Sequence, residues 1–268
     1  MDNVNHRFKS GSIVAKYIYI NVGVFILIQL IQILFRLFLK EAEFLSYFEM
    51  SSNPVLLAHR PWTMIAYMFV HIDFLHIFFN MLWLYWFGKL FLQFYTGRQF
   101  SGIYLLGGIA GGALFLLAYN VFPYFQKLPD IGLIGASASV MAIVFAVSFY
   151  RKEYTIRLLF IGQIKLIYLA FVVLIIDILA ITSENAGGHI AHIGGALSGI
   201  FFAFQYQRAK ENYSQPETKR QRESDDAYLR RKQEESRIID EILDKLKRSG
   251  YESLSSDEKK QLFNASRR

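Results

Sequence analysis

The chain has 268 residues, of which 53% are hydrophobic and 25 are phenylalanine, and its formal net charge is +7. This apolar content exceeds what a soluble core needs and indicates a membrane protein. The absence of cysteine excludes disulfide scaffolds, thiolate nucleophiles, iron–sulfur clusters and cysteine zinc sites.

Six apolar segments are predicted to cross the membrane as helices. A bilayer core needs roughly 20 apolar residues per helix, or fewer where the protein thins the bilayer. The segments cover residues 17–35, 74–88, 103–122, 131–150, 166–182 and 189–206. We therefore expect an all-α integral membrane protein in which residues 14–207 form a six-helix domain with a long, partly helical first loop.

The distribution of Lys and Arg predicts the orientation of these helices. Basic residues gather before the first segment, between the second and third, between the fourth and fifth, and after the sixth. The connection between the fifth and sixth segments contains no basic residue. The positive-inside rule then places both termini in the cytoplasm, including an N-terminal segment of residues 1–13.

The chain changes character after the sixth segment. Residues 208–234 are highly charged and indicate a linker, either flexible or a solvated helix. Residues 235–268 predict a small cytoplasmic helical hairpin, because apolar residues recur at helical spacing up to Leu246, Gly250 follows, and Ser255 with Glu258 matches a capping box. Such a tail could associate with itself, bind a cytoplasmic partner, or only improve solubility.

Polar side chains within apolar helices are the candidates for chemistry, because they are costly in a bilayer. The following lie toward the non-cytoplasmic ends of the second and sixth segments: His71, His76, Asn80, His189 and His192. The fourth segment starts on the same side with residues 135–139, which include two serines. A hydroxyl, several imidazoles and a carboxamide are therefore expected to converge near the outer leaflet.

This set of groups is suited to acyl transfer. A serine becomes nucleophilic when a neighbouring base takes its proton, and Ser137 with His192 could form that pair. The free N–H groups of a helix N-terminus, with His76 and Asn80, could stabilise an oxyanion. Ser139 is the competing nucleophile, but it faces nearly the opposite way, and we expect it to bond a carbonyl one turn back.

Other interpretations of the same residues remain open. Ser137 could be structural, His76 and Asn80 could join helices by hydrogen bonds, and the histidines could bind zinc. Asp177, within the fifth segment, is expected to pair with another group or to reach water.

Three motifs on the second, fourth and sixth segments together resemble the rhomboid family of intramembrane serine proteases. They are H-x-x-x-x-H-x-x-x-N at His71, His76 and Asn80, G-x-S at Gly135 and Ser137, and A-H-x-x-G at Ala191, His192 and Gly195. The resemblance covers about residues 10–207 and includes Trp62 in the first loop. The chain departs from the family pattern at Thr63, Leu92, Ala138 and Met141, none of which is a reacting group.

The resemblance implies a role for each motif residue. Ser137 would be the nucleophile, His192 the general base, and His76, Asn80 and the Ser137 backbone N–H the oxyanion site. His71 and Gly135 would belong to the surrounding pocket, while Gly195, Gly199 and Trp62 would serve packing. In this family the serine and histidine act without an aspartate, so the resemblance implies no catalytic role for Asp73 or Asp177.

The implied function is that of an intramembrane serine endopeptidase that cleaves transmembrane segments of other membrane proteins. A bacterial inner membrane is the expected location, and no metal, cofactor, ATP or nucleic acid is implied. The alternative is a catalytically silent rhomboid-like scaffold that binds transmembrane segments without cutting them. A transporter would leave the combination of motifs unexplained.

Overall fold

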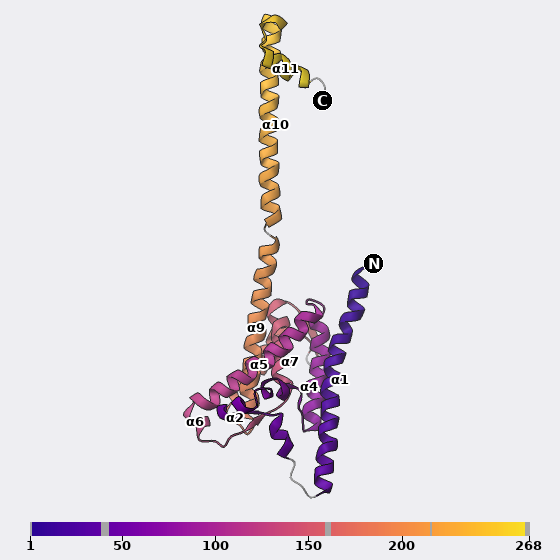
Figure 1. Cartoon of the computed structure of the whole chain (residues 1–268), viewed down its shortest axis with the longest axis vertical. Coiled ribbons are helices and arrows are strands. Elements are labelled where there is room, and N and C mark those ends of the chain that lie inside the picture. Colours follow the sequence, from indigo (N-terminus) through magenta and orange to yellow (C-terminus); the bar gives the residue numbers. More distant parts are fainter. Residues whose placement is uncertain (1, 39–42, 159–161, 215, 266–268) are drawn as a thin grey trace. The chain divides into compact units, whose positions relative to one another are not determined.

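The computed structural model describes residues 2–38, 43–158, 162–214 and 216–265 (Figure 1). The chain divides into two compact units, Met1–Gln207 and Arg208–Arg268, and each is described by itself. The main helices are α1 (Asp2–Leu37), α4 (Phe74–Phe91), α5 (Gly97–Val121), α7 (Ser137–Tyr150), α8 (Leu166–Leu179), α9 (Ala186–Ser214), α10 (Pro216–Ser249) and α11 (Ser256–Ala265). The short helices are η1 (Glu43–Tyr47), α2 (Pro54–His59), α3 (Thr63–Ala66), η2 (Tyr67–Phe69), α6 (Pro123–Gln126) and η3 (Tyr251–Ser253).

Three of the described helices are long and apolar enough to cross a membrane: α1 over Ile13–Leu37, α5 over Gly97–Val121 and α9 over Ala186–Lys210. A fourth candidate span combines Thr63–Phe69 with α4, which are bent by 91° at the break between them. Helices α7 and α8 are apolar but have 14 residues each, about 21 Å at 1.5 Å per residue, which is shorter than a bilayer core of about 30 Å. The structure therefore supports three to four spans by length and composition.

The fourth apolar segment starts its helix later than the sequence predicts, at Ser137 instead of residue 131. Strand β2 (Gly132–Leu133) pairs there with β1 (Met50–Ser51) in an antiparallel register that joins Met50 to Leu133. The backbone N–H of Ser52 also donates to the carbonyl of Ile131 at 2.9 Å. These long-range bonds hold residues 131–133 extended, so the helix can begin only after them.

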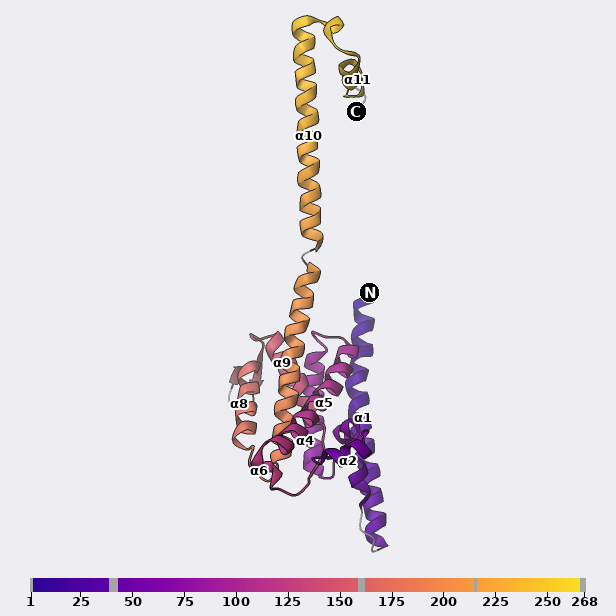
Figure 2. The same cartoon turned by 60° about the vertical axis from the view of Figure 1, so that its left-hand side comes forward.

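Helix α7 lies at the centre of the first unit. It packs against α4, α5 and α8, and every residue from Ala138 to Ser148 is buried. A helix that is apolar on all sides is expected where neighbouring helices surround it. Figure 2 shows α8 beside α9 at the edge of this bundle. The start of α7 is thereby fixed among elements that approach it from several directions.

A second strand pair follows α7. Strands β3 (Thr155–Leu158) and β4 (Gly162–Lys165) form an antiparallel hairpin, with Thr155 opposite Lys165. The sequence predicts only a basic connection here, so this strand pair is a difference from the expected all-α fold. The hairpin leads directly into α8.

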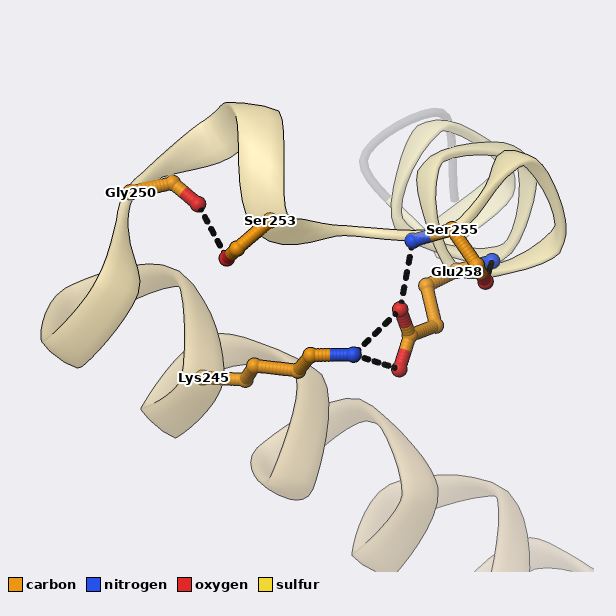
Figure 3. Close-up of polar contacts among 5 residues, drawn as sticks. All are labelled: Lys245, Gly250, Ser253, Ser255 and Glu258. Atoms are coloured by element: carbon orange, nitrogen blue, oxygen red, sulfur yellow. Dashed lines mark hydrogen bonds and ion pairs between the residues drawn. The ribbon is translucent and has the colours of Figure 1, made fainter.

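The second unit consists of α10, η3 and α11. Residues 216–234, part of the stretch 208–234 that is expected to be a linker, either flexible or a solvated helix, belong to helix α10. Gly250 follows this helix with φ +75°, a conformation that glycine adopts at little cost. Figure 3 shows the capping box before α11: the Ser255 N–H donates to Glu258 at 2.7 Å, and the Glu258 N–H donates to Ser255 Oγ at 3.2 Å. Lys245 of α10 contacts the same carboxylate at 2.9 Å, which ties the two helices together.

Candidate active site

A cavity of about 400 Å³ opens between four helices of the first unit. Most of its wall is apolar. Its polar lining consists of His76 and Asn80 of α4, Ser137 of α7, Asp177 of α8, Asn185 directly before α9, and His192 of α9. Residues separated by more than 100 positions in the sequence therefore face one space.

Ser137 is the first residue of α7, where the helix presents backbone N–H groups that lack partners within the helix. The two residues before it are held by long-range bonds. The Gly135 N–H donates to the carbonyl of Tyr67 at 2.9 Å, and the Ala136 N–H donates to His71 Nε2 at 3.2 Å. His71 therefore fixes the turn that precedes Ser137.

Gly135 permits two features of this turn. Its φ of +114° lies in a region that side chains disfavour. A β-carbon at this position would also lie 2.7 Å from Cε1 and 2.8 Å from Nε2 of His76. The imidazole of His76 thus lies directly against the backbone of the turn, close to the start of α7.

The polar residues of α4 are held by their own helix. Asp73 caps the helix by accepting the His76 N–H at 2.8 Å. Asn80 is buried, and its Nδ2 donates to the carbonyl of His76 at 2.9 Å. The carboxamide lines the cavity, but its amide nitrogen points along α4 in this state.

His192 contacts Asp177, an acid to which the family resemblance assigns no catalytic role. Asp177 Oδ1 lies 2.9 Å from His192 Nδ1 and 2.8 Å from His189 Nδ1. Since Nδ1 makes this contact, Nε2 is the ring nitrogen of His192 that could accept a proton. Asp177 stands near the end of α8, and both histidines stand near the start of α9. The sequence signal that could have revealed this cluster is an acid shortly before a turn and two histidines shortly after it.

The same cluster is the one set of described residues with the ligand types and spacing to hold a metal ion. Its three ligand atoms lie within 4.8 Å of one another. Two imidazoles and a carboxylate suit zinc. The observed separations of 2.8 and 2.9 Å are hydrogen-bond lengths.

The two serines of α7 have different surroundings. Ser137 is partly exposed to the cavity, and its hydroxyl has no hydrogen-bond partner within the described residues. Ser139 is fully buried, and its Oγ contacts Met68 Sδ at 3.9 Å. The expectation that Ser139 bonds a carbonyl one turn back is therefore wrong, because a sulfur atom from the first loop lies within its reach.

Glycines bring α9 against α7. A β-carbon at Gly195 would lie 2.8 Å from the carbonyl carbon of Ala138 and closer still to its oxygen. A β-carbon at Gly199 would lie 3.0 Å from the carbonyl carbon of Ala142. Trp62 lies away from this contact, and its Nε1 donates to the carbonyl of Tyr47 within the first loop at 2.8 Å.

The assembled groups have the composition of an acyl-transfer site. They comprise a hydroxyl at a helix N-terminus, an imidazole that contacts Asp177 through Nδ1, and further polar groups on α4. Among the residues that the structure describes, no hydrogen bond joins Ser137 to His192, and such bonds often tighten only when substrate binds. A pair of this kind can activate the hydroxyl for attack on a carbonyl.

Comparison with known proteins places the chain in a family. Residues 58–209 match the model of the Rhomboid domain, and residues 222–268 match a "Family of unknown function (DUF6576)". "Rhomboid-like protease 1" of Toxoplasma gondii is 24% identical over 169 residues, covering 62% of this chain and 54% of that protein. "RHOMBOID-like protein 12, mitochondrial" of Arabidopsis thaliana is 32% identical over 145 residues, covering 50% and 43%.

The chain thus spans about half the length of these curated relatives. The Rhomboid match covers more than half of the chain and includes α4, α5, α7, α8 and most of α9. It contains every residue that lines the polar part of the cavity. The chain belongs to the rhomboid family.

Proposed function

We propose that this protein is an intramembrane serine endopeptidase that cleaves transmembrane segments of other membrane proteins. One observation carries the proposal: Ser137 and His192 line the same cavity, which lies within a bundle of apolar helices. Membership of the rhomboid family adds support, because this family acts on membrane-protein substrates within the bilayer.

The proposed reaction uses Ser137 and His192 as a nucleophile and a general base. Ser137 Oγ attacks the scissile carbonyl carbon while His192 Nε2 takes the hydroxyl proton. The tetrahedral intermediate then collapses, the C–N bond breaks, and His192 returns the proton to the leaving amine. In the second half of the reaction, His192 Nε2 takes a proton from a water molecule, and this water attacks the carbonyl carbon of the ester. The ester C–O bond then breaks, the acid product leaves, and His192 gives the proton to Ser137 Oγ.

The developing oxyanion would be stabilised from two sides. The Ser137 N–H stands at the helix start, where its dipole favours negative charge. The His76 ring lies against Gly135 from the α4 side, and Asn80 lines the same cavity. Asn80 would have to turn from the His76 carbonyl to donate to the substrate.

The cavity also constrains the substrate. A fully hydrogen-bonded helix hides its carbonyls, so a segment with helix-breaking residues should be cut in preference. Such a segment would enter laterally between helices, because the cavity lies within the apolar part of the bundle. The polar side chains of the cavity would hydrogen-bond the water that the second step consumes.

We further propose six membrane crossings with both termini in the cytoplasm of a bacterial inner membrane. The basic connections support this orientation, and the exposed apolar side chains of α8, such as Ile175 and Ile176, suit contact with lipid. The natural absence of cysteine permits a direct test. Single cysteines at Lys152 and Glu184 should be labelled by a membrane-impermeant reagent from opposite sides, and labelling from the same side would contradict the proposal.

The C-terminal hairpin would bind a second copy or a cytoplasmic partner. Apolar side chains on α10 and α11, including Ile238, Leu243 and Phe263, remain exposed in this unit. Deleting residues 208–268 should then change the oligomer size or the set of bound proteins. If neither changes, the tail has no such role.

The function is tested by cleavage of a single-span substrate in liposomes. Wild type and Ser139→Ala should cut it, whereas Ser137→Ala and His192→Ala should not. If every form binds a panel of substrates without cutting any of them, the chain is a silent scaffold and the proposed function is wrong.

A further inference from the structure

Asp177 is an unusual residue for its helix. Only Leu166, Ala170 and Asp177 are buried among the residues of α8, and most of the remaining side chains are exposed or half-buried apolar groups. The Asp177 side chain is 4% exposed. A carboxylate inside an apolar helix is costly unless nearby groups compensate its charge. The contacts of Asp177 should therefore explain its position.

Those contacts go to the ring that would serve as the general base. Asp177 Oδ1 lies 2.9 Å from His192 Nδ1. A carboxylate at Nδ1 keeps the ring proton on that nitrogen and leaves the lone pair on Nε2. It also stabilises the imidazolium that forms when Nε2 takes a second proton. Both effects suit a histidine that accepts a proton through Nε2.

We propose that Asp177 is the positioning residue of His192, so that the site operates as Ser137–His192–Asp177 and not as a two-residue pair. This inference rests on the proposed function. The proton travels from Ser137 Oγ to His192 Nε2 and then to the leaving amine. Asp177 stays ionised throughout and transfers no proton.

His189 holds the carboxylate from a second direction. Its Nδ1 lies 2.8 Å from the same Oδ1 atom, and its ring centroid lies 6.0 Å from that of His192. The other oxygen, Oδ2, is buried and has no hydrogen-bond partner within the described residues. The orientation of Asp177 is therefore set by the first turns of α9, the same helix that carries the base.

The titratable groups that surround His192 come from three elements. Asp177 belongs to α8, His189 to α9 itself, and His76 to α4. Helix α7 contributes the Ser137 hydroxyl to the shared cavity. Asp177 is the only acid among these groups, so its removal should destabilise the protonated form of His192.

The test compares Asp177→Asn and Asp177→Glu with wild type in liposomes that contain a chelator. Asp177→Asn keeps the shape but loses the charge, and we expect kcat to fall about ten- to hundredfold with little change in KM. The pH–rate profile of Asp177→Asn should also differ from that of wild type, because the carboxylate no longer stabilises the imidazolium. Asp177→Glu should recover part of the rate.

Asp130→Asn is the matched control. Asp130 is exposed and accepts a bond from Asn53 Nδ2 at 2.9 Å, outside the cavity lining, so its loss should alter neither kcat nor the pH profile. Thermal unfolding of each variant would show whether it is folded. A purely structural role for Asp177 would lower the melting temperature and leave the pH profile of the remaining activity unchanged.

The outcomes separate this inference from the proposed function. If wild type cleaves and Ser137→Ala does not, but folded Asp177→Asn matches wild type in rate and pH profile, the positioning role is wrong and the serine protease stands. If the chelator alone abolishes wild-type cleavage, the three side chains hold a cation and the inference is also wrong. If Ser137→Ala cleaves like wild type, the proposed function fails and the inference fails with it.

Discussion

Gly111 of α5 lies between the two helices that carry Ser137 and His192. A β-carbon there would lie 2.6 Å from the β-carbon of Ala138 and 2.7 Å from the carbonyl oxygen of Ala191. These are the residues next to Ser137 and His192 in the sequence. Neither neighbour can turn away, since one is a methyl group and the other is backbone. Gly111→Ala must therefore move α7, α9 or α5 itself.

The size of the movement follows from these distances. Ordinary contact begins at 3.4 Å, so each approach must lengthen by about 0.7–0.8 Å. Overpacking of this kind costs about 1–3 kcal/mol, and the better helix propensity of alanine offsets up to about 1 kcal/mol. A misplacement of about 1 Å can slow catalysis roughly a hundredfold. We therefore expect Gly111→Ala to lose about ten- to hundredfold in kcat/KM with a net destabilisation of about 0–2 kcal/mol.

The assay is cleavage of a single-span substrate, accompanied by thermal unfolding of the same preparations. Gly102→Ala is the matched control on the same helix, because a β-carbon at Gly102 meets nothing within 4 Å. It should keep wild-type activity. Wild-type kcat/KM in Gly111→Ala would refute the reasoning, since it would mean that the relative position of α7 and α9 does not limit the reaction.

Two further outcomes are expected. Tyr67→Phe should lower the free energy of unfolding, measured by denaturation, by about 1 kcal/mol, because the buried hydroxyl donates to the Gly108 carbonyl at 2.6 Å. Tyr19→Phe, at an exposed position, is the control and should leave the free energy of unfolding unchanged. In the tail, the Ser255 N–H and then Lys245 hold the pKa of Glu258 below its ordinary value of 4.5. The stability that this carboxylate contributes is thus fully present above pH 4.5 and is lost as the pH falls through its folded pKa. Hydrogen exchange of α11 in the full chain should therefore accelerate only in that acidic range. Acceleration that begins near neutral pH would contradict this prediction.

The sequence predicted the residues of the cavity better than their contacts. Apolar runs and the positions of His76, Asn80, Ser137 and His192 were sufficient to expect a polar cluster on neighbouring helices, and all four line one cavity. The resemblance to the rhomboid family was confirmed by the match over residues 58–209. These features depend on local pattern and on spacing, which a single sequence displays.

The contact between Asp177 and His192 was missed for a physical reason. Their approach depends on the turn between α8 and α9 and on the direction of each side chain, neither of which hydropathy describes. The start of α7 was misplaced for a similar reason. The pairing of Met50 with Leu133 joins segments more than 80 positions apart, and it overrides the apolar run that begins at residue 131.

The identity of the nucleophile is the central claim, and a covalent adduct tests it most directly. A fluorophosphonate that reacts with activated serines would be incubated with wild type, Ser139→Ala and His192→Ala in detergent, and the modified residue located by peptide mass spectrometry. We predict an adduct on Ser137 in wild type and Ser139→Ala, and none in His192→Ala. An adduct on Ser139, or substrate cleavage by protein that carries no Ser137 hydroxyl, would contradict the account.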